Sequence, residues 1–295
     1  MILRKKILNY LIYSIKRDYL WNIIEEYFIK EFVNHYKKYG IDKIFLYDNN
    51  NINGEKFDDI ISNYLKDNFV EIINARGKIA SQFNILNHCY KRNKKKYDWL
   101  IFYDVDEYIH LKKYSNIKEF LSQDKFNQCK IIYLNAFRHT DNDLLYYDNR
   151  PLVKRFPYIK WKSKLYTVKS IIKGHLKGIK IKSLHWLDRR IKGCNSYGKE
   201  IKPTKNIKMS LSFNELYIQD NYIDHYCFKS TQEYINKILK GDGIFGYRNR
   251  TKNYKIYLYF KYNKITLEKI EYIEKITNLN LTNYKLRLIK QKKFY

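Results

Sequence analysis

Apolar and polar residues follow two different spacings over the first 110 residues of the chain. Four short apolar runs predict strands, at Tyr10–Ile15, Lys43–Tyr47, Val70–Ile73 and Trp99–Tyr103. Three longer segments between these runs predict helices, at Trp21–Tyr39, Phe57–Lys66 and Ala80–Tyr90. This alternation favours an α/β fold in which a doubly wound, mostly parallel sheet is flanked by helices.

The second half of the chain has a less regular pattern. Strands are predicted over Cys129–Leu134 and Leu165–Ile172, and a helix over Ile265–Ile276. A further helix is predicted over Gln232–Lys240, because Ser230 and Thr231 precede it and suit a helix N-terminus.

The composition favours one compact domain. With 45% hydrophobic residues and only 3 Pro, the chain can bury a large core and contains no typical linker. We expect a nucleotide-binding domain over residues 1–250 and a basic, helical extension rich in Tyr and Lys over residues 251–295. Within that extension, Tyr254–Tyr262 is expected to be an amphipathic surface element. It would contact a lipid-linked acceptor or a membrane face, or pack on the core.

The net charge of +28 has two explanations that the sequence leaves open. It could attract a polyanion, such as nucleic acid, or a phosphate-bearing substrate. However, Lys, Asn, Ile, Tyr and Phe dominate the chain, and AT-rich codons encode all five. A biased genome would therefore give the same excess of lysine, and we expect no specific nucleic-acid partner.

The cysteines and the N-terminal segment favour a cytoplasmic location. The four cysteines are widely spaced, so a structural zinc site is not expected and we predict buried free thiols in a reducing compartment. Near the N-terminus, Arg17 and Asp18 interrupt the apolar stretch, which fits neither a signal peptide nor a membrane span.

Three carboxylates follow the apolar strand Trp99–Tyr103. Alternate residues of an extended segment point the same way, so Asp104 and Asp106 can converge on one ion, with Glu107 beside them. Ligands of parallel sheets bind at the carboxyl ends of strands, where Asp48 also lies. Oxygen ligands of this kind favour Mg²⁺ or Mn²⁺. The alternative is a solvated turn, since Asp-x-Asp recurs by chance.

Three segments resemble a glycosyltransferase group related to families 2 and 92. The first is Glu31-Phe-Val-Asn-His-Tyr-Lys-Lys-Tyr-Gly, which continues to Asn50. The second is Asp98-Trp-Leu-Ile-Phe-Tyr-Asp-Val-Asp-Glu-Tyr. The third is Asp224-His-Tyr-Cys-Phe-Lys-Ser-Thr-Gln-Glu-Tyr, which continues to Gly241. The three segments occur in the order that this group shows, and the resemblance covers roughly residues 10 to 245.

The resemblance implies a GT-A fold, inverting chemistry, a UDP-sugar donor and a glycan or glycoconjugate acceptor. Asp104 and Asp106 match the group's metal and diphosphate motif, and Asp48 matches the position that contacts the nucleoside. In the donor site, the resemblance also assigns a role to residues that match the group's other positions, namely Gln82, His225 and Lys229.

Further site residues are predicted with alternatives open. His185 is the expected third metal ligand, His225 competes with it, and either could be an ordinary structural histidine. An inverting transfer needs a general base, for which the candidates are Asp141, Asp143 and Glu107. Glu107 could instead orient the metal motif.

Cations and aromatic residues complete the candidate site. Arg76 follows a predicted strand and could face the nucleobase or a phosphate, and Lys169 could pair with diphosphate oxygens. Trp161 and Trp186 could stack on a sugar ring, although buried tryptophans are commoner in protein cores.

We therefore predict a metal-dependent glycosyltransferase that moves a hexose from a UDP-sugar to a glycan hydroxyl. Two other functions compete. A metal-dependent nuclease or nucleotidyltransferase would use the same carboxylates, and it predicts two metals and a basic groove. A polyanion-binding protein would use only the net charge, and intact Asp104, Asp106 and Glu107 count against it.

Overall fold

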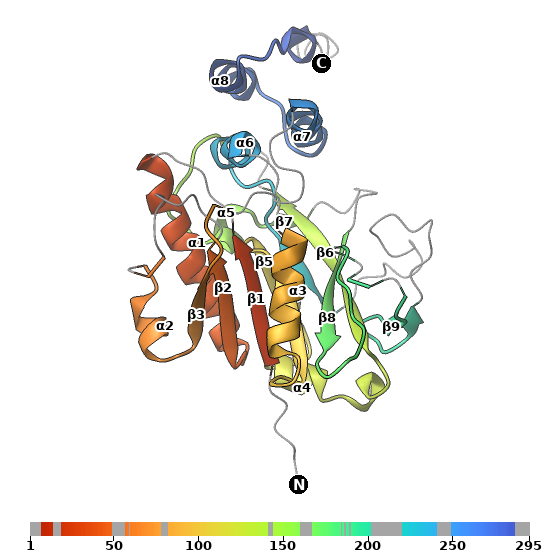
Figure 1. Cartoon of the computed structure of the whole chain (residues 1–295). Helices are drawn as coiled ribbons and strands as arrows, with labels where there is room; N and C mark the ends of the chain where they lie inside the picture. The colour runs from red at the N-terminus through yellow and green to blue at the C-terminus, as the bar shows by residue number, and fades with distance from the viewer. Residues whose placement is uncertain are drawn as a thin grey trace. The chain divides into compact units, whose positions relative to one another are not determined.

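The chain is seen here in a computed structural model (Figure 1). It describes residues 7–13, 19–48, 57–77 without 59, 82–140, 144–159, 167–201 without 184, 186 and 189, 220–240 and 249–286. Residue contacts divide the chain into two compact units. Unit 1 consists of residues 1–138 and 162–225, and unit 2 of residues 139–161 and 226–295. This grouping divides the chain before residue 250, and the domain boundary expected there stays a prediction.

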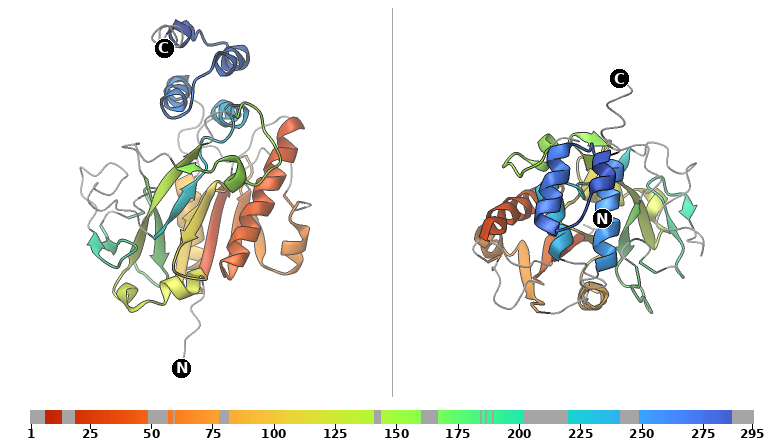
Figure 2. Two further views of the ribbon diagram at one scale, coloured as in Figure 1. Left: turned by 180° about the vertical axis from the view of Figure 1, so that it is seen from behind. Right: turned by 90° about the horizontal axis from the view of Figure 1, so that it is seen from above.

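Four parallel strands form one half of the sheet in unit 1. They are β1 (Ile7–Tyr13), β2 (Lys43–Asp48), β3 (Val70–Asn74) and β4 (Trp99–Tyr103), in the order β4-β1-β2-β3. The crossovers contain α1 (Tyr19–Lys38), α2 (Ser62–Lys66) and α3 (Gln82–Asn93). Helices α1 and α3 cover opposite faces of the sheet (Figures 1 and 2). The predicted doubly wound arrangement is confirmed, although the second helix is shorter than its predicted span.

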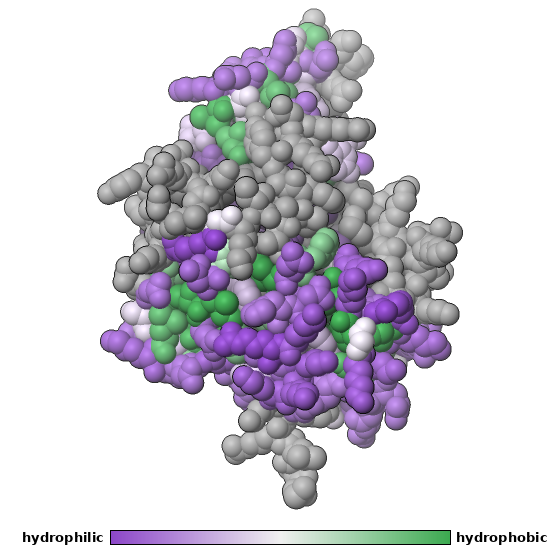
Figure 3. All heavy atoms as spheres, viewed as in Figure 1, coloured by the Kyte–Doolittle hydropathy of each residue, from purple (hydrophilic) through white to green (hydrophobic). Residues whose placement is uncertain are grey.

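The apolar runs form strands because the sheet buries them on both faces. No residue of β4 is more than 5% exposed, and every residue of β2 is buried. A strand covered by helices on both sides reads as a continuous apolar run rather than an alternating one. The charged residues lie mainly outside this core, and hydrophilic side chains dominate the described surface on the face drawn in Figure 3.

The other half of the sheet contains antiparallel pairs. Strand β8 (Thr167–Lys173) lies between β4 and β6 (Ile131–Thr140) and is antiparallel to both. The helix α4 (Ile117–Leu121) and the short 3-10 helix η1 (Asp124–Phe126) precede β6. Beyond β6, the two-residue strands β9 (Gly193–Cys194) and β10 (Glu200–Ile201) form the edge opposite β3.

A pair of strands that the sequence did not predict completes unit 1. Strand β5 (Glu107–Leu111) follows β4 after a three-residue turn and pairs antiparallel with β11 (Asn221–His225). Strand β11 also pairs parallel with β6. Glu107 opens β5 because the next residues, Tyr108 and Ile109, are buried against α1.

Two side chains of α1 hold β5 in place. The hydroxyl of Tyr36 donates to the carbonyl of Glu107 at 2.8 Å and accepts from the amide of Ile109 at 3.1 Å. His35 Nε2 lies 3.1 Å from the Ile109 carbonyl and donates to it, because a carbonyl can only accept. Burial lowers the pKa of His35 to about 4, so this ring is neutral at neutral pH.

We predict that the free energy of unfolding decreases as the pH is lowered from 7 to 4, because His35 must stay neutral in the folded protein. Its pKa is 6.5 when unfolded and about 4 when folded, so the unfolded chain binds the proton first. The stability linked to neutral His35 is fully present above pH 6.5. It is lost as the pH falls towards 4, by up to about 3 kcal/mol. Urea unfolding at several pH values measures this loss. The variant His35→Gln should show a smaller loss between pH 7 and pH 4, and an equal loss would contradict the prediction.

Unit 2 consists of α5 (Leu152–Arg155), β7 (Tyr158–Ile159), α6 (Thr231–Lys240), α7 (Asn249–Tyr262) and α8 (Leu267–Thr277). The predicted start of α6 is confirmed, since the carboxylate of Glu233 accepts from the amide and the hydroxyl of Ser230. In α7, Tyr259 is buried while Tyr254 and Tyr257 are about half exposed, and the amphipathic surface role expected of this segment stays a prediction. None of the described helices is long and apolar enough to span a bilayer.

A fully buried ion pair joins two segments of unit 2. Arg155 Nη1 lies 2.9 Å from Glu233 Oε2, and both side chains are 1% exposed. A second arginine of this unit, Arg150, pairs with Asp148 at 2.6 Å but is 56% exposed. The two pairs have similar geometry and very different surroundings.

We predict that Arg155→Met lowers the free energy of unfolding by about 3–5 kcal/mol, because it leaves the Glu233 carboxylate buried without its cation. The matched variant Arg150→Met should cost less than about 1 kcal/mol, since water replaces an exposed partner. Chemical denaturation measures both variants. If both variants lowered the free energy of unfolding equally, burial of the ion pair would not determine the effect of breaking it.

One prediction about the cysteines is wrong. Cys129 and Cys194 form a disulfide with a Cα–Cα distance of 5.9 Å, although 65 residues separate them in sequence. The sheet brings them together, because Cys129 precedes β6 and Cys194 lies on the neighbouring β9. Cys89 is a buried thiol, as predicted, and burial raises its pKa.

Candidate active site

A tight turn between β4 and β5 positions the three carboxylates. The amide of Glu107 donates to the carbonyl of Asp104 at 3.0 Å. In return, the carboxylate of Glu107 accepts from the amide of Asp104 at 3.1 Å. These two bonds close the turn on itself. Asp106 therefore lies 3% exposed beside fully buried Glu107, while the Asp104 side chain is 35% exposed.

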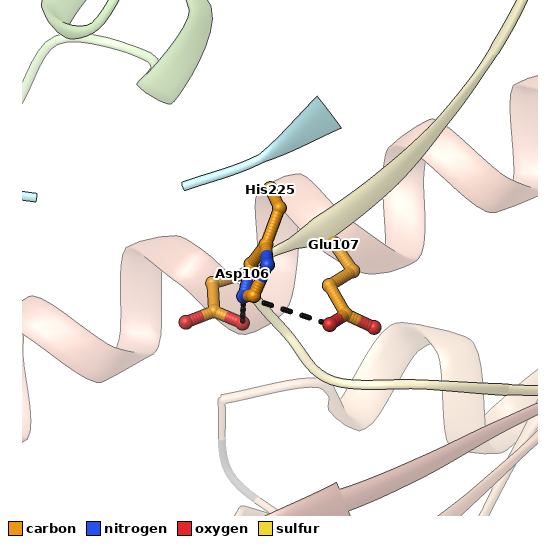
Figure 4. A group of neighbouring side chains, drawn as sticks. All are labelled: Asp106, Glu107 and His225. Carbon is orange, nitrogen blue, oxygen red and sulfur yellow. Dashed lines mark ion pairs between the residues drawn. The ribbon is translucent and has the colours of Figure 1, made fainter. Parts of the chain in front are cut away.

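Strand β11 brings a histidine against these carboxylates. His225 lies directly opposite Glu107 in the β5–β11 register. Its Nε2 is 3.7 Å from Asp106 Oδ1 and 3.6 Å from Glu107 Oε1. Figure 4 shows the imidazole between the two carboxylates. One ligand atom from each of the three residues lies within 4.8 Å of the others, which is compatible with a metal site.

Lys169 on β8 places a positive charge against these carboxylates. Its ammonium lies 2.7 Å from Glu107 Oε1 and 3.1 Å from Asp104 Oδ2, and its side chain is 4% exposed. Burial by itself would lower the pKa of Lys169, but the two carboxylates more than offset it and the net pKa is raised. Lys169 is therefore charged.

The site carries an excess of negative charge. Burial is the largest effect on the Glu107 carboxyl and raises its pKa; the Lys169 ammonium acts against this, while the neighbouring Asp104 and Asp106 raise it as well. Two of these carboxylates, Asp104 and Glu107, contact the one ammonium, and Asp106 lies beside Glu107. A second cation among them would relieve this repulsion, since like charges at such distances disfavour ionisation.

His185 lies near this site but outside the group of three ligands. Its Nδ1 is 3.0 Å from the carbonyl of Val168, so Nδ1 carries the proton and Nε2 carries the lone pair. Burial, followed by the charge of Lys169, lowers the pKa of His185 to about 4. It is neutral and able to act as a ligand. Among the described residues, however, the geometric group contains His225 and not His185.

Asp48 and Arg76, predicted separately, contact each other. Arg76 donates to Asp48 Oδ2 from Nε at 2.7 Å and from Nη2 at 2.6 Å. Asp48 ends β2 and Arg76 follows β3, and these strands are parallel neighbours, so the two side chains meet at the same edge of the sheet. Their side chains are only 4% and 11% exposed.

The family follows from a comparison over nearly the whole chain. The model of glycosyltransferase family 92 matches residues 24–290. The chain belongs to glycosyltransferase family 92. This family 92 member is therefore a glycosyltransferase, and the predicted resemblance is confirmed. A search of curated proteins finds no match.

Three solved structures show a distant likeness to this family 92 glycosyltransferase. A 4-diphosphocytidyl-2C-methyl-D-erythritol synthase has a TM-score of 0.33 at 12% identity, and the match covers 58% of this chain and 76% of the synthase chain. A putative glucose-1-phosphate thymidylyltransferase from Bacillus anthracis has a TM-score of 0.33 at 13% identity, covering 57% and 71%. S. aureus TarS has a TM-score of 0.38 at 12% identity, and the match covers 90% of this chain but 46% of TarS.

Several predicted residues take no part in the described geometry. The candidate bases Asp141 and Asp143 lie outside the described residues, as do Trp161 and Trp186. Gln82 is the first residue of α3 and is partly exposed. Lys229 belongs to unit 2 and has a left-handed backbone with φ of 50°. The roles predicted for these residues stay predictions.

One cation near the two histidines was not among the predicted site residues. Arg138 on β6 lies opposite His225 in the β6–β11 register, and it interacts electrostatically with His185. Its position on β6 was not predicted, because the predicted strand ended at Leu134 while β6 continues to Thr140. The sequence signal for this position was an arginine that follows shortly after the apolar run and would lie near the end of a longer strand.

We predict that Lys169→Met destabilises unit 1 by about 3–5 kcal/mol, because Glu107 loses its ammonium partner while staying buried. Adding Glu107→Gln to this variant should restore part of the loss, since the buried carboxylate is then gone. Thermal and urea unfolding measure both.

The control is Lys112→Met. Lys112 pairs with Asp220 at 3.5 Å but is 66% exposed, so its removal should cost less than about 1 kcal/mol. If the double variant were as unstable as the two single variants combined, Lys169 and Glu107 would not be coupled.

Proposed function

We propose that this family 92 glycosyltransferase moves a hexose from a UDP-sugar to a hydroxyl of a glycan or glycoconjugate, with inversion and with Mn²⁺ or Mg²⁺. The observation that supports this most is the grouping of Asp106, Glu107 and His225 beside the carboxyl end of β4. Ligands of α/β sheets bind at this edge. The nuclease, nucleotidyltransferase and polyanion-binding alternatives lose their support, because family membership assigns glycosyl transfer.

The residues present fit a divalent cation. Asp106 Oδ1 is a buried carboxylate oxygen that faces His225 Nε2, and this donor set combines oxygen with imidazole nitrogen. Such a set favours Mn²⁺ over Mg²⁺, which prefers oxygen ligands alone. We propose Asp104, Asp106 and a histidine as ligands, with His225 favoured by geometry and His185 as the alternative.

Glu107 is better suited to orient the ligands than to bind the metal. Its two oxygens already contact the Lys169 ammonium and the Asp104 amide, and the residue is 0% exposed. Groups that fix the direction of metal ligands commonly have this position. Its burial also counts against contact with an acceptor hydroxyl, so we favour Asp141 or Asp143 as the general base.

The residues of the chain would divide the work of the transfer. When bound, the cation would neutralise the diphosphate as it leaves. Lys169 adds positive charge beside the carboxylates, and Arg138 adds it beside the two histidines. The Asp48–Arg76 pair at the neighbouring strand ends would contact the nucleoside. The base would take the proton of the acceptor hydroxyl while its oxygen bonds to the anomeric carbon and the bond from that carbon to the diphosphate breaks.

The cellular location stays a proposal. A cytoplasmic enzyme with peripheral membrane contact through the Tyr-rich α7 is the location that the sequence favours. The half-exposed Tyr254 and Tyr257 are compatible with such contact. The Cys129–Cys194 disulfide weighs against a reducing compartment, where such bonds are rare.

We predict that Asp104→Asn and Asp106→Asn each reduce turnover at least about a hundredfold, because each removes a charge that would face the metal and diphosphate. The measurement is release of UDP from a panel of UDP-sugars with Mn²⁺, and chelation with EDTA should stop it. Unfolding curves should show that both variants remain folded.

The control is Asp67→Asn, which makes the same chemical change at a surface pair with Lys37 where the aspartate side chain is 59% exposed. It should keep full activity. The variants His225→Asn and His185→Asn decide between the two histidines. Only replacement of the histidine that binds the metal should raise the Mn²⁺ concentration needed for half-maximal rate. Unchanged UDP release in both aspartate variants would overturn the assignment.

A further inference from the structure

A basic cavity lies on unit 1 at the edge of the sheet formed by β9 and β10. Its volume is about 520 Å³, within the roughly 300–1,000 Å³ range of small-ligand sites. Four cations line it, namely Lys125, Lys130, Arg190 and Lys192. Glu200 is the single carboxylate among its lining residues. The cavity is therefore strongly positive.

Only half of these cations are neutralised by neighbours. Arg190 pairs with Asp188, and Lys192 pairs with Glu200 at 2.8 Å. Lys125 donates to the hydroxyl of Tyr114 and lies over aromatic rings. Among the residues that the structure describes, no carboxylate pairs with Lys125 or Lys130. Lys125 and Lys130 thus line the cavity without a carboxylate partner among those residues.

Close packing fixes the walls of this cavity. The disulfide joins Cys129 in one wall to Cys194 in the other, and both cysteines line the cavity. A side chain at Gly193 would meet the Ile131 carbonyl at 2.5 Å, so only glycine permits this approach. At Gly198, where φ is +84°, a side chain would meet Lys125 Cβ at 2.7 Å. Lys125 is therefore held against the opposite wall.

The cavity is separate from the candidate active site. Lys130 directly precedes β6, whereas Arg138 lies near the other end of the same strand. A strand rises about 3.3 Å per residue, which places the two roughly 25 Å apart. A substrate that reached both would have to be a chain rather than a single sugar.

We propose that this cavity binds the anionic group, phosphate or carboxylate, of a sugar in an acceptor glycan. The anion would bond to Lys125 and Lys130, and the remaining polar lining would surround the sugar ring. That the sugar belongs to an acceptor rests on the proposed function. Binding of the anion does not, because it depends only on the cavity.

The test is calorimetric titration of the full chain with three probes: glucose 6-phosphate, glucuronate and uncharged glucose. At least one anionic probe should bind and weaken as salt is raised, while glucose should not bind. The tighter of the two anions identifies the group. The variant K125E/K130E should weaken binding at least about tenfold, as expected for the loss of charge-assisted hydrogen bonds.

The matched control is K95E/K96E, which makes the same change of charge at two exposed lysines outside the cavity. It should bind as the natural chain does. The milder K130Q should give a smaller loss, which keeps the test valid if the double variant unfolds. Opening the disulfide with C129S/C194S should also weaken binding, because the walls are then no longer joined.

Three results would overturn the proposal: no binding of either anion, equal binding of glucose, or an equal loss in K95E/K96E. The variant Asp106→Asn separates this site from the transfer reaction. It should bind the anionic probe normally while UDP release is lost. If UDP release were absent in the natural chain but the anion still bound, the proposed function would fail and the cavity would stand.

Discussion

The contact of Lys169 with Glu107 is the interaction on which the arrangement of the site depends. Glu107 has no exposure, so its charge requires a partner inside the protein, and Lys169 provides it at 2.7 Å. A buried ion pair of this kind gives little net stability compared with apolar residues of the same size. Its value lies in geometry, because the other Glu107 oxygen is then directed to the Asp104 amide and closes the turn. Asp104 and Asp106 take their positions from that closed turn.

The sequence predicted the elements that make this turn but not the strands that surround it. Strand β4 was recognised because every residue is apolar, and Asp104 and Asp106 stood out by following it. Strand β5 begins with a carboxylate, and its partner β11 lies more than a hundred residues later. A pairing at that separation leaves no local pattern, so the place of His225 opposite Glu107 could not be derived. The resemblance named His225 and left its partners open.

The same limit applies to pairs whose members were each recognised alone. Asp48 and Arg76 were both noted at strand ends, and their contact follows once β2 and β3 are known to be neighbours. The disulfide is the opposite case. Cysteine spacing along the chain favoured free thiols, but the sheet places β9 beside β6 and brings Cys129 to Cys194. In each case, sheet order supplies what local residue patterns lack.

The number of lysines in the chain and the positions that they occupy in the fold have different explanations. A biased genome can account for the number of lysines, but it cannot account for which of them are buried or grouped. In a chain of net charge +28, the Lys169 ammonium contacts two carboxylates, Asp104 and Glu107, with Asp106 beside them, so the site is locally negative. At the other end of β6, Lys125 and Lys130 line a cavity with one carboxylate. These two regions have opposite local charge, and the net charge of the chain alone predicts neither of them. Position, rather than total charge, is therefore what indicates a ligand.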